Sequence, residues 1–434
     1  MSTLAVTGGE VLLPDMTVEE ADLLIDTDAG TIERIADPGE IEGDEELDAA
    51  DGLVIPGLVN AHTHVAMTLF RGNADDKPLD AWLQEDIWPV EAELTAADIR
   101  AGTALGIAEM IRTGTTAFAD MYFFMDEVVD VVEEAGLRAR LSRGCITVGK
   151  GEEEAHEDFE ESLAFAREYD GAAEGRIGTA FSPHSLTTVG REFFEEYVPA
   201  AREEGIPIHL HANETVNEVE PLVEEYGKRP LEYADDLDLL ADDSFFAHGV
   251  HVDEREIELL AERGTAVIHN PASNMKLASG MAPVQELLDA GVPVGLGTDG
   301  AGSNNDLDMF DEMRDAAMLG KLAADDASAV AAPSAVEIAT AGSAGAIGID
   351  SGRIEEGANA DIAVVGLDAE HLTPKHDLVS HLAYAAKGSD VRHTVCDGEV
   401  LMRDRELQTL DLDAVIEDAN ERAAELFARA ADGE

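Results

Sequence analysis

The sequence predicts an α/β fold in which eight β/α units close into a (β/α)8 barrel of the triosephosphate isomerase type. From residue 53 onward, short β-rich runs alternate with helical patterns, which is the signature of βαβ units around a parallel sheet. Most of these runs follow a helical pattern that ends at a glycine, as in IAEMIRTG, VVDVVEEAG and VQELLDAG. Helices that stop in this way return the chain to the next strand of the barrel.

The predicted strands also indicate where the chemistry of the protein should lie. They are the runs at residues 53–64, 115–122, 137–145, 176–185, 206–214, 244–251, 265–273 and 292–300. In barrels of this type, functional residues lie on the loops at the carboxyl ends of the strands. The polar residues that end each run are therefore the first candidates for a site.

The two ends of the chain are expected to build one small β-domain together. Residues 1–55 hold short strands and turns, as does the stretch 350–407, where TVCDGEVLM has the Asp-Gly signal of a tight hairpin. Residues 56–349 are assigned to the barrel. Residues 408–434 form a predicted C-terminal helix with apolar residues at helical spacing, which is most simply a packing element.

The charge of the chain is extreme, because 28 basic residues face 93 acidic ones and leave a formal net charge of −65. A surface this acidic repels phosphate backbones and anionic lipid heads, so nucleic acid and membranes are not expected as partners. A hydrophobic content of 45% also argues against an acidic disordered chain. The pattern is typical of adaptation to molar salt, where the Debye length falls to about 3 Å, and indicates a halophilic, archaeal source.

The cysteines and the N-terminus indicate the compartment. Cys145 and Cys396 are far apart and match no metal-binding spacing, so both are expected to be free thiols in a reducing environment. The sequence MSTLAVTGGEVLLPD lacks a basic region followed by an apolar core, and no run of about 18 uncharged apolar residues occurs. We therefore expect a cytoplasmic protein.

Two histidines stand two residues apart at the end of the first predicted strand. Residues at i and i+2 of a strand share a face, so His62 and His64 in VNAHTHV can converge on one point. For this motif alone, a pair of polar histidines at a strand end is a more natural interpretation than a metal site, because a two-residue motif often occurs without function. The other strand ends carry further polar residues: His184, His211 followed by Glu214, His248 and Asp299. Histidines and an aspartate at one barrel mouth are suitable ligands for zinc or a similar divalent ion.

Several longer motifs resemble those of a known family. They are PGLVNAHTH, WPVEAELT, SPHSL, HLHANET, AHGVH, HNPASNMKLASGMAPV and GTDGAGSNNDLDMFDEMR. Together they resemble the amidohydrolase superfamily, and within it the 5'-methylthioadenosine/S-adenosylhomocysteine deaminases, nearly from end to end. Relatives of this kind carry a small β-sandwich made from both termini, which the resemblance implies here as well.

The resemblance implies a metal centre. His62, His64, His211 and Asp299 match the metal ligands of the family. Relatives with two metals usually carry a bridging carboxylated lysine at the end of the fourth strand, where this chain has His184. One divalent ion per chain is therefore expected, with Zn²⁺ as the first choice and Fe²⁺, Ni²⁺ or Mn²⁺ as alternatives.

The implied reaction is the hydrolytic deamination of an adenosine-type nucleoside to its inosine analogue and ammonia. A divalent metal can lower the pKa of a bound water from 15.7 to about 7, which supplies the nucleophile. Glu214 would act as the proton shuttle, and His248 and Asp299 would hold the attacking water. A general acid or base of this kind contributes about 10² to 10⁴ in rate.

The resemblance also implies substrate contacts. Glu91 matches a ribose-binding glutamate, and His184 is expected to contact the substrate rather than the metal. Arg143 matches an arginine for the amino-acid carboxylate of S-adenosylhomocysteine, which its planar fork can pair bidentately. Some relatives have a second arginine about a dozen residues later, but this chain has the acidic stretch GKGEEEAHED there, which we expect to be a loop. Methylthioadenosine, 5'-deoxyadenosine and adenosine therefore remain open as substrates.

Some polar residues near the site are interpreted as structural. His209, one layer deeper on the strand of His211, is expected to be a packed barrel histidine, and His251 and His269 are likewise not expected to be ligands. Asp120 is interpreted as a supporting acid. Alternatives to nucleoside deamination are a guanine or triazine-type hydrolase on the same site and an inactive metal-binding barrel. The sequence leaves open whether the chain forms a homo-oligomer.

Overall fold

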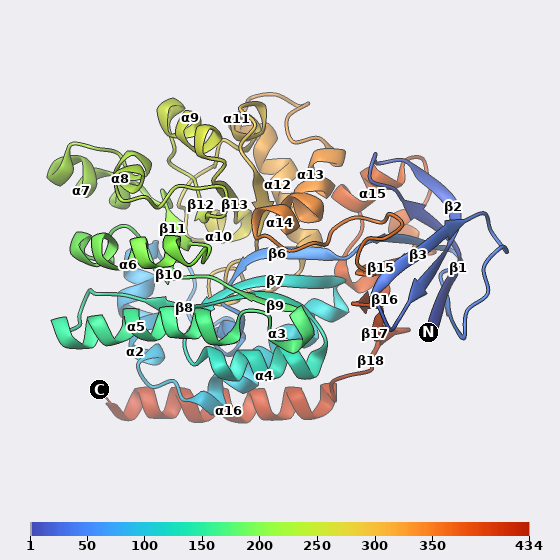
Figure 1. Cartoon of the computed structure of the whole chain (residues 1–434), viewed down its shortest axis with the longest axis horizontal. Helices are drawn as coiled ribbons and strands as arrows, with labels where there is room; N and C mark the ends of the chain where they lie inside the picture. The colour runs from blue at the N-terminus through green and yellow to red at the C-terminus, as the bar shows by residue number, and fades with distance from the viewer. Residues whose placement is uncertain (1, 434) are drawn as a thin grey trace.

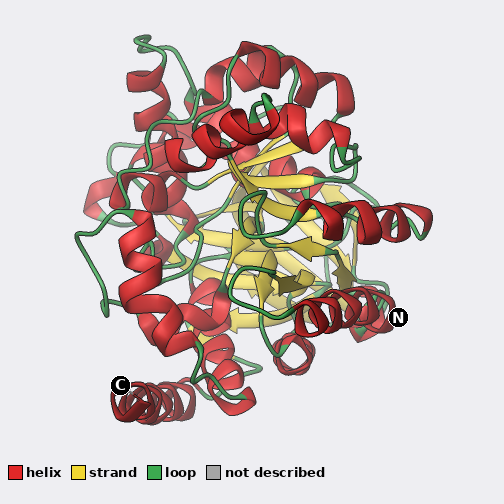
Figure 2. Cartoon of the chain, turned by 90° about the vertical axis from the view of Figure 1, so that its left-hand side faces the viewer, coloured by secondary structure: helices red, strands yellow, loops and turns green. Residues whose placement is uncertain are grey.

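The computed structural model describes residues 2–433 and has the predicted α/β architecture, a parallel barrel beside a small β-domain (Figure 1). One group of strands forms a parallel set at the centre of the chain. They are β6 (Leu58–Thr63), β7 (Thr115–Tyr122), β8 (Arg138–Cys145), β9 (Ile177–Thr179), β10 (Ser182–Pro183), β11 (His209–Ala212), β12 (Phe245–His248), β13 (Ala266–His269) and β14 (Val294–Leu296). Figure 2 shows the strands at the centre of the molecule with helices around them.

The parallel strands form two sheets that backbone hydrogen bonds join into a barrel. One sheet has the order β10-β8-β7-β6, with β9 also on β8, and the other has the order β11-β12-β13-β14. On one side the amide of His209 donates to the carbonyl of Phe181 at 3.0 Å. On the other side the amide of Asp299 donates to the carbonyl of His62 at 3.0 Å. Both seams run beside residues that the sequence analysis placed at the barrel mouth.

Helices cover the outside of the barrel and connect its strands. They are α1 (Leu79–Trp82), α2 (Trp88–Glu91), α3 (Ala96–Arg112), α4 (Met125–Ala135), α5 (Glu152–Tyr169), α6 (Arg191–Glu203), α7 (Val216–Tyr226), α8 (Pro230–Asp236), α9 (Glu254–Arg263), α10 (Pro271–Lys276), α11 (Val284–Asp289), α12 (Met309–Ala323), α13 (Ala332–Ala339), α14 (Ala341–Ala346), α15 (Leu378–Tyr384) and α16 (Leu412–Gly433). Short 3₁₀ or π turns are η1 (Val65–Phe70), η2 (Leu83–Ile87), η3 (Ala173–Gly175), η4 (Glu370–Leu372) and η5 (Gly388–Asp390). Gly136 follows α4 with φ +88°, which a glycine adopts without strain.

Strands from both ends of the chain share one nine-stranded sheet, with the path β18-β17-β16-β15-β5-β1-β2-β3 and with β4 on β1. Its strands are β1 (Thr3–Leu12), β2 (Val18–Asp26), β3 (Thr31–Ala36), β4 (Glu45–Asp48), β5 (Gly52–Pro56), β15 (Ile362–Gly366), β16 (Val391–Cys396), β17 (Glu399–Arg403) and β18 (Glu406–Leu407). The antiparallel pair β5 and β15 joins the two ends, and the sheet has its own core, which includes Leu23, Val54 and Ile362. The predicted hairpin is confirmed, since Asp397 and Gly398 connect β16 to β17 with φ of +52° and +76°.

Three elements differ from the sequence prediction. The run 176–185 is two short strands, β9 and β10, which both pair with β8. The run 53–64 is two strands, because the chain turns at Gly57 and leaves the terminal sheet for the barrel; a Cβ there would lie 2.0 Å from Thr116 Oγ1. The acidic stretch expected as a loop is mostly helical, since α5 begins at Glu152. Three glutamates in its first turn, at residues 152, 153 and 154, favour the helix by facing the positive end of its dipole.

The C-terminal helix packs against the barrel. α16 lies along α3 (Figure 1), with Leu426 fully buried and the ring of Phe427 centred 6.0 Å from that of Phe70. Arg429 adds an ion pair with Asp98, which is itself fully buried. The helix therefore covers the barrel wall behind the first β/α unit.

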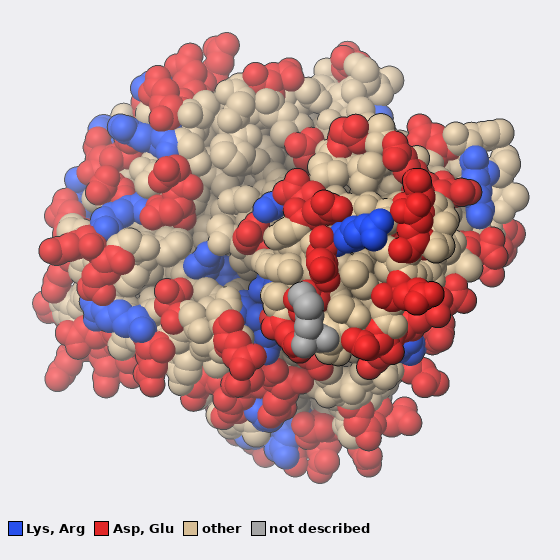
Figure 3. Space-filling view, turned by 45° about the vertical axis from the view of Figure 1, so that its right-hand side comes forward, with Lys and Arg blue, Asp and Glu red and all other residues tan. Residues whose placement is uncertain are grey.

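Acidic side chains dominate the face shown in Figure 3, with lysines and arginines scattered singly among them. Most of the arginines lie in ion pairs, such as Arg100 with Glu134 at 2.5 Å and Arg167 with Glu204 at 2.5 Å. The remaining acidic groups repel one another unless salt screens them. Among residues 2–433, no helix combines the length and the apolar composition that a membrane crossing requires.

Candidate metal and catalytic site

Five of the predicted site residues converge at the carboxyl end of the barrel. His62 lies on β6, His64 follows it, His211 lies on β11, His248 ends β12 and Asp299 follows β14. The Nε2 atoms of His62 and His64 lie 3.5 and 3.3 Å from Asp299 Oδ1. His211 Nε2 lies 3.3 Å from His64 Nε2. Atoms from four barrel strands that are distant in sequence therefore point at one small volume.

The donor set fits a divalent cation. His62 Nε2 is buried and has no hydrogen-bond partner among the described residues, although it faces this cluster. Burial lowers the pKa of the His62 imidazole to about 4, so the ring is neutral and its nitrogen lone pair is available. Ligating atoms of two triads lie within 4.8 Å of one another; they are His62, His64 and His211, and His62, His248 and Asp299. Imidazole nitrogens with one carboxylate oxygen are ligands that zinc prefers.

In the first triad, the Nδ1 atom of each imidazole also has a hydrogen-bond partner. His64 Nδ1 lies 2.6 Å from the carbonyl of Met121, and His211 Nδ1 lies 2.7 Å from the carbonyl of His184. His62 Nδ1 lies 2.8 Å from Nε2 of His209. Such contacts fix the ring orientation and keep Nε2 directed at the shared volume.

Two serines that sequence reasoning missed hold the carboxylate of Asp299. The hydroxyls of Ser273 and Ser303 each donate to Asp299 Oδ2 at 2.7 Å, which leaves Oδ1 facing the histidines. Both serines lie inside the motifs HNPASNMKLASGMAPV and GTDGAGSNNDLDMFDEMR. Those motifs were the only signal for them, because their contact with the aspartate depends on how two loops fold together.

The backbone at the mouth adopts a costly conformation at three positions. Asn213, His248 and Asp299 have φ values of +56°, +77° and +62°. Residues other than glycine rarely adopt this left-handed region, and strain of this kind concentrates at functional sites. At His248 and Asp299 the strained residue is itself part of the cluster.

Glu214 is a buried carboxyl beside this cluster. It is 5% exposed, its Oε2 lies 3.7 Å from His248 Nε2, and Ser279 Oγ donates to its Oε1 at 3.3 Å. Burial and the charge of Asp299 raise the pKa of Glu214 to about 8. The group can therefore carry a proton near neutral pH. Burial and the charge of Glu214 also raise the pKa of Glu218 to about 7.

Two predicted substrate residues border the cluster. His184 lies with its ring centre 4.6 Å from that of His211, and burial lowers its pKa to about 3. Glu91 accepts a hydrogen bond from the hydroxyl of Tyr122 at 2.7 Å, and burial raises its pKa. The ring centre of Tyr122 lies 5.9 Å from that of His64, so Glu91 stands one side chain away from the cluster.

Arg143 pairs with acidic side chains outside the cluster. It lies at the end of β8, and its guanidinium is 3.1 Å from Asp158 and ion-paired with Glu161, both on α5. Asp158 is shared with Lys150 at 2.7 Å, and the Arg143 side chain is 22% exposed. The helix that replaced the expected acidic loop thus supplies the partners of this arginine.

The residues interpreted as structural are buried or hydrogen-bonded to the backbone. His251 Nε2 lies 2.7 Å from the carbonyl of Ser279. His269 is fully buried, and neither of its ring nitrogens has a partner among the described residues. Asp120 accepts a hydrogen bond from the amide of Val65 at 2.9 Å, and burial raises its pKa to about 7.

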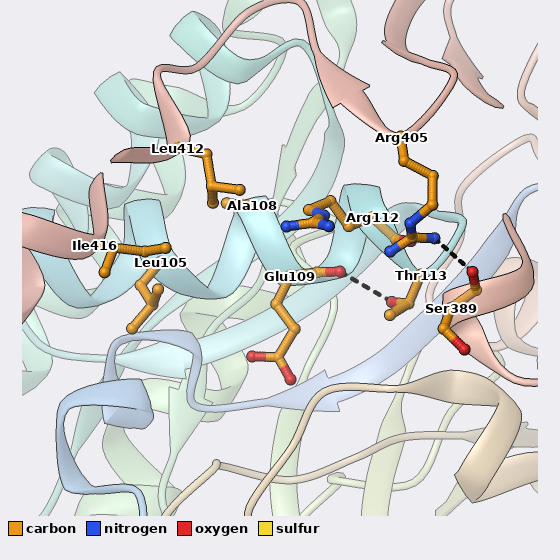
Figure 4. Close-up of a pocket in the computed structure, with 9 residues that line it drawn as sticks. All are labelled: Leu105, Ala108, Glu109, Arg112, Thr113, Ser389, Arg405, Leu412 and Ile416. Carbon is orange, nitrogen blue, oxygen red and sulfur yellow. Dashed lines mark hydrogen bonds between the residues drawn. The ribbon is translucent and has the colours of Figure 1, made fainter. Parts of the chain in front are cut away.

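A separate pocket of about 340 Å³ lies between α3, α16 and the terminal β-domain (Figure 4). Its lining combines the aliphatic side chains of Leu105, Leu412 and Ile416 with the charged side chains of Arg112 and Arg405. No residue of the histidine cluster lines it. It therefore belongs to the packing of the C-terminal helix rather than to the barrel mouth.

Comparisons with known proteins agree with the fold and the site. Residues 53–401 match the Amidohydrolase family. A 5-methylthioadenosine/S-adenosylhomocysteine deaminase of Haloarcula marismortui is 69% identical over 100% of both chains. A 5'-deoxyadenosine deaminase of Methanosarcina mazei is 46% identical over 96% of this chain and 99% of that protein. The structure of an adenosine deaminase from Xanthomonas campestris with bound zinc is 38% identical over 98% of each chain, with a TM-score of 0.93. The chain belongs to the amidohydrolase family and, within it, to the 5-methylthioadenosine/S-adenosylhomocysteine deaminases.

Proposed function

We propose that this chain catalyses the metal-dependent hydrolytic deamination of 5'-methylthioadenosine, S-adenosylhomocysteine or both, giving the inosine analogue and ammonia. One observation carries the proposal: a buried carboxyl with a raised pKa, Glu214, lies beside a set of nitrogen and oxygen donors that face one another. The names of the similar deaminases support the same reaction class.

We propose His62, His64, His211 and Asp299 as the ligands of one divalent ion, with zinc as the first choice. The zinc in the similar adenosine deaminase supports this choice, and Fe²⁺, Ni²⁺ or Mn²⁺ would also suit these donors. A single ion is favoured because His184, rather than a lysine, follows the fourth barrel strand. A bound divalent ion supplies an acidified water at neutral pH.

Three side chains would manage the protons and the attacking water. His248 and Asp299 would orient the water toward C6 of the purine. Glu214 would take a proton from that water and deliver it to ring N1, a role for which a pKa near neutrality is well suited. Glu214 or Asp299 would then pass the second proton, from the hydroxyl added at C6, to the amino group, which leaves as ammonia. In an inactive metal-binding barrel, the buried Glu214 beside the proposed metal ligands would have no function.

The substrate contacts are proposed from the borders of the cluster. Glu91, held by Tyr122, would accept hydrogen bonds from the ribose hydroxyls, and His184 would contact the substrate beside His211. Arg143 would bind a carboxylate at the far end of the 5' substituent. Because its guanidinium already pairs with Asp158 and Glu161, S-adenosylhomocysteine must compete for it, and methylthioadenosine should be at least as good a substrate.

A second substrate, 5'-deoxyadenosine, is kept because a relative of that name is 46% identical to this chain. The test is ammonia release in molar KCl from methylthioadenosine, S-adenosylhomocysteine, 5'-deoxyadenosine and adenosine. We expect the highest kcat/KM with one of the first two. Ammonia release from none of the four would refute the proposal, and a clear preference for 5'-deoxyadenosine would favour the second candidate.

We also propose a division of the chain into domains. Residues 1–55 and 350–407 would form the composite β-sandwich, residues 56–349 the barrel, and residues 408–434 the C-terminal helix. The sheet shared by strands from both ends supports this division. A cytoplasmic location is proposed as well, and the two buried free cysteines are consistent with a reducing compartment.

A further inference from the structure

His62 differs from His64 and His211 in the hydrogen-bond partner of its Nδ1 atom. His64 and His211 place Nδ1 against backbone carbonyls, which can only accept a hydrogen bond. His62 places Nδ1 against Nε2 of His209, at 2.8 Å, and an imidazole nitrogen can either donate or accept. The tautomer of His62 is therefore not set until the tautomer of His209 is set.

A second contact sets the tautomer of His209. Its Nδ1 lies 3.5 Å from the hydroxyl of Ser142, and that hydroxyl donates to the backbone carbonyl of Asp120 at 2.9 Å. Because the carbonyl can only accept, the single proton of the hydroxyl is used there, and the serine oxygen is left to accept from His209 Nδ1. His209 Nε2 then carries no proton and must accept from His62 Nδ1. The lone pair of His62 Nε2 is consequently free and faces the cluster.

The surroundings keep this chain of contacts in place. His209 is fully buried, and its ring stacks on Phe245 with centres 4.3 Å apart and planes 26° apart. Ser142 is fully buried on β8. Because the chain of contacts is buried, no solvent can replace its hydrogen bonds. If both histidines adopted the opposite tautomers, His62 Nε2 would carry a proton at the position where a cation would have to bind.

We infer that His209 and Ser142 are positioning residues, which fix His62 in the tautomer and orientation that bind a metal ion. This inference rests on the metal site proposed above. It gives the buried histidine at position 209 a task beyond packing, although it does not make it a ligand. Its removal should weaken metal binding about 10- to 100-fold, as for other partners of metal-binding histidines.

The experiment measures zinc release from the zinc-loaded full-length protein to a colorimetric chelator in molar KCl. His209→Leu removes the acceptor, and we expect it to release zinc about 10- to 100-fold faster than the wild type. His209→Gln can present a side-chain carbonyl to His62, and we expect it to restore most of the retention. The matched control is His269→Leu, which removes another fully buried barrel imidazole, one without a hydrogen-bond partner among residues 2–433. This variant should leave the release rate unchanged.

The outcomes separate this inference from the function on which it rests. A wild type that holds no zinc or other divalent ion would refute the metal site itself. A wild type that holds zinc, with His209→Leu releasing it at the same rate, would overturn the role of His209 alone. Equal acceleration in His209→Leu and His269→Leu would also overturn it, because any lost imidazole would then suffice. If His209→Leu does not fold, Ser142→Ala decides, since it must release zinc several-fold faster than the wild type.

Discussion

Replacing Arg143 with alanine should reduce activity on S-adenosylhomocysteine and leave activity on methylthioadenosine nearly unchanged. The two substrates share adenine and ribose and differ in the carboxylate-bearing tail. The ratio of their losses in kcat/KM therefore isolates the contact with the tail as a difference of free energies. The structure bounds the size of that difference through the groups that surround the guanidinium.

Truncating one partner of a fully buried charge pair costs about 2 to 5 kcal/mol, whereas an exposed pair contributes about 0.2 to 1 kcal/mol. The Arg143 side chain is 22% exposed, and its guanidinium already lies 3.1 Å from Asp158 and pairs with Glu161. An incoming carboxylate must share the guanidinium with these acids, so the expected loss lies between the exposed and the buried ranges. We expect a loss of about 1 to 2 kcal/mol, which is about 5- to 30-fold in kcat/KM at 1.36 kcal/mol per tenfold.

The assay is ammonia release at several concentrations of each substrate in molar KCl. Glu161→Gln is the matched control, because it removes a competing carboxylate from the same arginine and should raise kcat/KM for S-adenosylhomocysteine. Equal losses on both substrates in Arg143→Ala would refute this reasoning. The arginine would then support the barrel or the ribose site instead of binding the tail.

Other variants and conditions test separate parts of the account. Glu214→Gln should lose at least about 10²-fold in kcat, because an amide cannot shuttle protons, and elemental analysis should show that it keeps its metal. A variant that retains a tenth of the wild-type kcat would contradict this role. Burial raises the pKa of Asp308 from 3.8 to about 7, so the folded state binds this proton more tightly than the unfolded state does. Ionisation of Asp308 therefore destabilises the fold as the pH rises from about 4 to about 7. Asp308→Asn has no carboxyl to ionise, so its Tm relative to the wild type should increase between about pH 4 and pH 7. A constant difference in Tm across this range would refute the assignment. The wild-type Tm should rise steeply with KCl as the net charge of −65 is screened, and a flat response would contradict the halophilic interpretation.

The sequence predicted the architecture because the signals for it are local. Periodic apolar runs and glycine-ended helices specify β/α units, and the Asp-Gly pair at 397–398 specifies a hairpin without reference to the rest of the chain. The split at Gly57 was missed because both halves of the run are apolar and β-rich. The close approach of Thr116 from another strand, which leaves no room for a side chain at residue 57, cannot be predicted from the run itself.

The site was predictable to a similar extent. Residues at strand ends, such as His62 and Asp299, could be identified because the barrel brings those ends together. The partners that hold them could not, since Ser303 and His209 make their contacts through loop folding and strand tilt that no spacing records. The same holds for Arg143, whose partners lie on a helix that sequence patterns suggested was a loop.

The central claim is that one divalent ion, held by four side chains, is required for deamination, and a metal titration tests it most directly. Protein stripped by a chelator and dialysed should release no ammonia from methylthioadenosine. Activity should return in proportion to added zinc and level off at one equivalent per chain, while His64→Ala should neither retain the ion nor recover. Full activity in the stripped protein would contradict the requirement for metal, and a plateau at two equivalents would contradict the single-ion site.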